Sequence, residues 1–70
     1  MNGHEIIKIL EKNGWVLERI TGSHHHYKKE REPFIITVPV HGKKDIVYAR
    51  KILKDAGIDM GKRRWKTYVL

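Results

Sequence analysis

Two short polar turns constrain the fold of this chain more than any other feature of its sequence. Residues 21–23 (Thr-Gly-Ser) and residues 30–33, which end in a proline, separate three predicted strands, of which the first is rich in β-branched and aromatic residues and the third is the most apolar. These segments are residues 15–20, 24–29 and 34–38. Connections this short cannot hold a crossover, so the sequence predicts an antiparallel three-stranded meander.

Segments with helical periodicity flank the predicted sheet. The first helix is expected over residues 4–13, with Asn2 as its N-cap and Asn-Gly at 13–14 as its stop. The second helix is expected over residues 45–56, with Asp45 as its N-cap. This α-β-β-β-α order predicts an α+β domain with both helices on one face of the sheet, because only one face has partners to bury it.

The second predicted strand carries different side chains on its two faces. Strand alternation places His24, His26 and Lys28 on one face. It places His25 and Tyr27 on the opposite face. If Tyr27 joins the core under the helices, His24 lies on the open face of the sheet or at its rim.

The chain has 70 residues, which suffice for one domain with a thin hydrophobic core. It lacks cysteine, so neither disulfides nor thiolate–metal sites can stabilise it. We expect residues 1–58 to form the domain and residues 59–70 to form a basic C-terminal tail. The tail contains Lys-Arg-Arg-Trp-Lys at 62–66, and its last residues, 67–70, could add a fourth strand, order on a partner or remain disordered.

A formal net charge of +7 limits the partners of the chain. It results from 15 Lys/Arg against 8 Asp/Glu, and such a field attracts nucleic acid or an acidic protein. The sequence has neither a membrane-length apolar run nor a basic helix with a large apolar face, which argues against a membrane partner. It also begins without a basic and apolar leader pattern, so the protein is expected to be soluble and cytoplasmic.

His24 is the first candidate for chemistry. Imidazole can accept and donate a proton near neutral pH, and a metal-free ribonuclease needs a base for the ribose 2′-OH and an acid for the leaving oxygen. Gly22 and Ser23 precede it in a turn whose backbone N–H groups could hold a phosphate oxygen. The pattern is also compatible with an ordinary strand histidine that follows a glycine–serine turn.

Several basic residues are candidates for phosphate contacts, which dominate the affinity of proteins for nucleic acid. The candidates for an RNA-binding surface are Arg19, Lys28, Lys43 and Lys44, together with Lys29, Arg50, Lys51 and Lys54. The alternative is a solvated surface that keeps the protein soluble.

The histidines also suggest a metal site. His24 and His26 could point the same way, and His41 would supply the third ligand of a three-histidine zinc site. Neither a cysteine nor a carboxylate stands at a recognisable ligand spacing. A zinc hydrolase is therefore the weaker alternative, and we expect no metal or other cofactor.

Short motifs occur in a specific order along the chain. They are Ile6-Ile7-Lys8-Ile9-Leu10, Asn13-Gly14-Trp15, Arg19, Gly22-Ser23-His24-His25 with Tyr27, Thr37-Val38-Pro39 with His41, and Ile52-Leu53-Lys54-Asp55-Ala56-Gly57-Ile58. In this order and spacing, they make the chain resemble the HicA family of toxin–antitoxin ribonucleases over residues 4–58. The resemblance implies a double-stranded-RNA-binding-domain-like fold. It also implies a ribosome-independent mRNA interferase that needs no metal or cofactor and is neutralised by a HicB-type antitoxin.

The resemblance places the family's catalytic histidine on His24, with Gly22 and Ser23 forming its turn. Two departures stand out. Position 26 is histidine where the family usually carries an apolar residue, and the chain after Ile58 differs from the family's usual short acidic helical end.

We therefore expect an endoribonuclease toxin that cleaves mRNA. His24 would act as general base or acid, and a nearby cation such as Lys28 would stabilise the phosphorane. The antitoxin is expected to cover His24, because masking the catalytic group is the simplest inhibition. A non-catalytic RNA-binding module of the same fold is the main alternative, since such domains read RNA shape and need no histidine.

Overall fold

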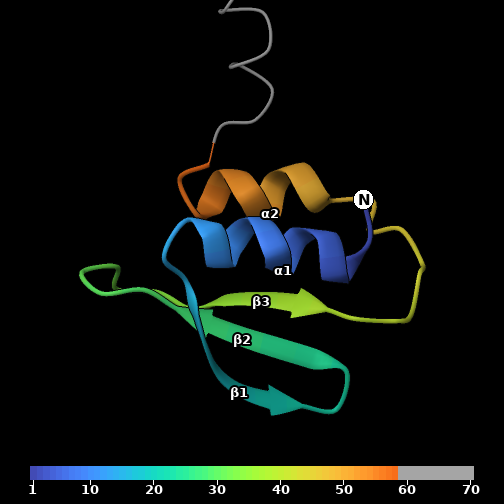
Figure 1. The fold of residues 1–70 in the computed structure, drawn as a ribbon, viewed down its shortest axis with the longest axis horizontal. Coiled ribbons are helices and arrows are strands. Elements are labelled where there is room, and N and C mark those ends of the chain that lie inside the picture. The colour runs from blue at the N-terminus through green and yellow to red at the C-terminus, as the bar shows by residue number, and fades with distance from the viewer. Residues whose placement is uncertain (59–70) are drawn as a thin grey trace, which may run out of the picture.

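The computed structural model describes residues 1–58, which form two helices and three strands. The elements are α1 (Gly3–Lys12), β1 (Val16–Thr21), β2 (His24–Lys28), β3 (Ile36–Pro39) and α2 (Ala49–Asp55). The strands form one antiparallel sheet in the order β1-β2-β3 (Figure 1). This arrangement confirms the predicted α+β class and the meander, and it is consistent with a double-stranded-RNA-binding-domain-like fold. The strand considered at 67–70 lies outside the described residues.

The hydrophobic core lies between the two helices and β3. Both helices pack against β3 and against each other, and β1 is the strand farthest from them (Figure 1). The core residues are Ile6, Leu10, Trp15, Tyr27, Ile36, Val38, Ala49, Ile52, Leu53 and Ala56. Because β1 lies farthest from the helices, every residue of that strand is exposed. In the part of the chain that the structure describes, neither helix is long and apolar enough to cross a membrane.

A capping box starts α1. The Asn2 side-chain oxygen accepts a hydrogen bond from the Glu5 N–H at 3.0 Å, and Glu5 Oε1 accepts one from the Asn2 N–H at 2.8 Å. The predicted N-cap is therefore confirmed. A Cβ on Gly3 would meet the Pro39 carbonyl oxygen at 2.7 Å, so only glycine lets the start of α1 lie this close to the end of β3.

The start of the second helix was predicted wrongly. α2 begins at Ala49, and its N-cap is Tyr48, which makes no side-chain capping bond. Asp45 is instead held by the N-terminal segment: its carboxylate lies 3.4 Å from the Met1 ammonium group, and it forms a β-bridge with Asn2. These tertiary contacts keep residues 45–48 out of the helix, although Asp45 is a good N-cap residue by type.

The third strand begins later than predicted. Pairing between β2 and β3 ends at Tyr27 and Ile36, so Phe34 lies outside the sheet. Its side chain is 40% exposed, and its ring packs on Trp15 with the ring centroids 5.8 Å apart. Trp15 is buried, as expected, but it precedes β1 rather than belonging to it.

Candidate active site

The β1–β2 turn sets the position of His24. Thr21 and His24 are paired across the hairpin, which leaves Gly22 and Ser23 as the turn. Gly22 has φ +63°, a conformation that short hairpin turns require and that side-chain-bearing residues rarely adopt. The Ser23 carbonyl accepts a hydrogen bond from the Val40 N–H at 2.8 Å. The turn before His24 is therefore tied to the segment that follows β3.

Alternate side chains of β2 lie on opposite faces of the sheet, as predicted. Tyr27 pairs with Ile36, and both are buried on the helix side. His24, His26 and Lys28 therefore lie on the other face, which we call the open face. The register places the following residues on it: Val16, Arg19, Thr21, His24, His26, Lys28, Thr37 and Pro39.

A β-bulge decides which side chain of β1 joins the open face. The register is Leu17 opposite Tyr27 and then Arg19 opposite His26, so Glu18 is the extra residue. A regular strand would place Glu18 opposite His26. The bulge thus places Arg19, rather than Glu18, opposite His26, and the two predicted RNA contacts Arg19 and Lys28 share a face with His24.

His26 is held by a side chain that sequence reasoning did not single out. Its Nδ1 is hydrogen-bonded to Oγ1 of Thr37, the residue paired with it on β3, at 3.0 Å. Its Nε2 is buried and has no hydrogen-bond partner among the described residues. Because His26 faces away from the helices, a polar residue at this position leaves the core packing intact. In the sequence, the polar Thr37 stands between the apolar Ile36 and Val38, and this alternation could have indicated that Thr37 shares a face with His26.

Lys43 and Lys44 lie in the loop between β3 and α2, outside the sheet. Both are exposed, and the loop follows Val40, whose N–H is bonded to the turn before His24. They therefore belong to the end of the sheet at which His24 lies, but they are loop residues and have no place in the strand register.

His41 lies in the same loop and does not complete a metal site. Among residues 1–58, no group of three or more His, Cys, Asp or Glu side chains is arranged to hold a metal ion. The proposed set of His24, His26 and His41 is therefore not brought together, and the zinc alternative finds no support in the described part of the chain.

The helix side of β2 serves the core. His25 pairs with Ile20 on β1 and with the buried Val38 on β3. Burial, and to a smaller extent the Glu11 carboxylate on α1, raises the pKa of the Tyr27 phenol above its ordinary value of 10.0. Tyr27 is therefore neutral at physiological pH, and its place in the core assigns it to packing.

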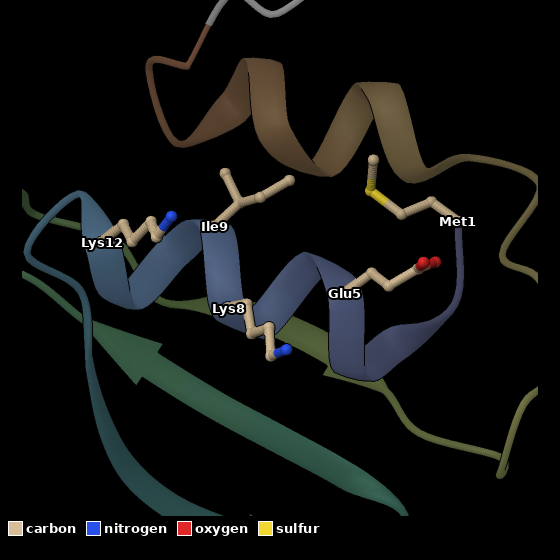
Figure 2. A pocket seen from close by; sticks show the side chains of 5 residues that line it. All are labelled: Met1, Glu5, Lys8, Ile9 and Lys12. Carbon is tan, nitrogen blue, oxygen red and sulfur yellow. The ribbon is translucent and has the colours of Figure 1, made fainter.

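A shallow groove on the helix layer lies apart from the open face. It measures about 570 Å³ and is lined by Met1, Glu5, Lys8, Ile9 and Lys12, along one side of α1 (Figure 2). Its lining includes no residue of the open face, so the groove is not part of the candidate active site.

Comparison with known protein families yields a match over most of the chain. The family model described as the HicA toxin of bacterial toxin–antitoxin systems matches residues 3–58 of the chain. This range contains both helices, the whole sheet and every residue of the open face. No curated protein matches the chain.

Proposed function

The chain belongs to the HicA toxin family of bacterial toxin–antitoxin systems, and on that basis we propose that it is a metal-independent endoribonuclease that cleaves mRNA. One observation carries the proposal: an exposed histidine, His24, lies on a sheet face together with the cations Arg19 and Lys28. Such a face combines a proton-transfer group with charges that attract a phosphate backbone.

The proposed reaction is attack of a ribose 2′-OH on the adjacent phosphate. His24 accepts the 2′-OH proton as general base, which contributes about 10²–10⁴-fold in rate. A cation then stabilises the negative charge that develops on the phosphoryl oxygens. Arg19 lies opposite His26, which is the next residue after His24 on the open face of β2, whereas Lys28 is one open-face position farther from His24. Arg19 therefore suits this role better than Lys28.

We further propose that Lys43 and Lys44 bind the RNA backbone beyond the cleavage site. They stand in the loop tied to the turn before His24, so a strand of RNA leaving the open face at that end would pass over them. Their contribution would be positional and salt-dependent, because phosphate contacts carry no sequence information.

The proposed partner is a HicB-type antitoxin that covers His24 and acts on the toxin in the cytoplasm. The net charge of +7 favours an acidic partner surface. Protection of the β1–β2 turn from hydrogen exchange in the complex would support this mode of inhibition, and unchanged exchange there would contradict it.

Cleavage of a defined mRNA tests the function. Purified wild type, His24→Ala and His4→Ala are compared with and without EDTA, with folding checked by circular dichroism. His4 is exposed on α1 and serves as the matched histidine control. EDTA-resistant cleavage that is lost only in His24→Ala is the expected result. Salt-sensitive RNA binding without cleavage by the folded wild type would identify a non-catalytic RNA-binding module instead.

A further inference from the structure

We propose that His26 is a second catalytic imidazole, which donates a proton to the leaving 5′ oxygen while His24 acts as the base. This inference rests on the proposed ribonuclease function and deepens it. A single histidine leaves the departure of an alkoxide unassisted. The open face carries a second imidazole, that of His26. Its Nδ1 is hydrogen-bonded to Thr37, and its Nε2 has no partner among the described residues, so the two nitrogens can serve different roles.

His24 and His26 are neighbours on one face of the same strand. His24 and His26 are two residues apart on β2 and lie on the same face, so their Cα atoms are about 6.6 Å apart at the rise of a β-strand. In-line displacement at phosphorus puts the attacking and the leaving oxygens on opposite sides of the phosphorus atom. A base and an acid must then flank the phosphate, which two side chains from one strand face can do.

A hydrogen bond to Thr37 fixes the orientation of the His26 ring. The Thr37 hydroxyl oxygen can accept a hydrogen bond from Nδ1–H at the observed 3.0 Å. This bond is available to the protonated ring, in which both nitrogens are donors. It holds the ring through Nδ1 and leaves Nε2 as the atom that can deliver a proton.

His26 Nε2 lacks a hydrogen-bond partner among the described residues of the free protein. Most buried side-chain nitrogens have one, and leaving such an atom without a partner is destabilising. Nε2 is buried in the free protein, so it must become accessible when RNA binds on the open face, where an RNA oxygen would supply the partner. Catalytic hydrogen bonds commonly form only in the complex with substrate.

The step balances in atoms and protons. His24 takes the 2′-OH proton, the 2′ oxygen bonds to phosphorus, the bond from phosphorus to the 5′ oxygen breaks, and His26 gives that oxygen its Nε2 proton. The products are a 2′,3′-cyclic phosphate and a 5′-hydroxyl end. His24 ends protonated and His26 neutral, and proton exchange with water restores both.

A one-atom change in the substrate tests this assignment. The cleavage site of the wild type is first mapped, and an oligoribonucleotide is then made with sulfur in place of the 5′ oxygen at that site. A thiolate leaves without protonation. We expect His26→Ala to slow cleavage of the natural RNA by about 10²–10⁴-fold and to cleave the sulfur substrate at close to the wild-type rate. His24→Ala should lose activity on both substrates.

The Thr37 contact provides an independent readout. Thr37→Val removes the hydroxyl and should lower cleavage of natural RNA, with Thr37→Ser restoring it and the sulfur substrate insensitive to both. Equal losses on the two substrates in folded His26→Ala, or no loss at all, would overturn the assignment of His26. If the folded wild type leaves natural RNA uncut, no cleavage site can be mapped and the ribonuclease function itself fails, which is a different result.

Discussion

Arg19 lies directly opposite His26 across the β1–β2 ladder, because Glu18 is taken up by a bulge. This pairing places a cation beside the two histidines of the open face. The proposed chemistry depends on the bulge, because a regular strand would have put the carboxylate of Glu18 opposite His26.

Two single-residue deletions distinguish the effect of the bulge from the effect of the Arg19 charge on RNA binding. Deletion of Glu18 and deletion of Arg19 each remove the extra residue, and each leaves Leu17 opposite Tyr27 and Ile20 opposite His25. The first keeps an arginine opposite His26, and the second leaves a glutamate there. We expect both variants to fold, the Glu18 deletion to retain RNA binding, and the Arg19 deletion to lose most of it. Circular dichroism and RNA titration at fixed salt measure these outcomes. Equal affinities for the two variants would argue against a role for the Arg19 charge.

The two loop lysines are expected to act through phosphate contacts. Lys43→Gln combined with Lys44→Gln should weaken RNA binding and reduce the slope of log affinity against log salt by about 1.4, at about 0.7 for each phosphate contact on a single strand. The same double substitution at Lys8 and Lys12, which are exposed on α1, is the control of equal charge. If the control changes the slope as much as the loop variant does, binding depends on net charge rather than on the loop.

The contributions of Asn2 and Asp45 to the free energy of unfolding can be measured separately. Asn2→Ala removes the capping box of α1 and should lower the free energy of unfolding by about 0.5–2 kcal/mol. Asp45→Ala removes only an exposed ion pair with Met1 and should change it by less than about 1 kcal/mol. Urea denaturation at neutral pH gives both values. A larger loss for Asp45→Ala would mean that this residue caps a helix after all.

The stability of the fold should fall in alkaline solution partly because of Tyr27. Its pKa is raised in the folded protein, chiefly by burial, so the folded state favours the neutral phenol. That contribution is complete below the ordinary pKa of 10.0 and is lost as pH rises above it. Tyr27→Phe cannot titrate, so its unfolding free energy should decrease less steeply between neutral pH and pH values above 10.0 than that of wild type. Parallel curves for the two proteins would exclude this contribution.

The sheet could be predicted from the sequence because its determinants are local. Short turns enforced antiparallel pairing, and the alternation around Tyr27 placed His24 on the open face. The bulge was missed, although Leu17 and Ile20 are three residues apart and both face the helix side, which a regular strand does not allow. That spacing was the available signal.

The errors arose where distant segments meet. Asp45 has the side chain of an N-cap, but its partner is Met1, which only the fold brings near. Phe34 looks like a strand residue, yet the pairing of β2 and β3 stops before it and the ring covers Trp15. The contact of His26 with Thr37 likewise depends on a cross-strand register that composition does not reveal.

The alternation of β2 has an evolutionary consequence. Its even-numbered positions, His24, His26 and Lys28, lie outside the hydrophobic core, while His25 and Tyr27 face the helix side. Substitutions at the even positions can therefore change which RNA is chosen, or how fast it is cut, without disturbing the core. A single inserted or deleted codon in this strand would exchange the faces of the residues beyond it, unless a bulge took up the change as in β1. Natural variants of the strand should thus differ by substitution more often than by length.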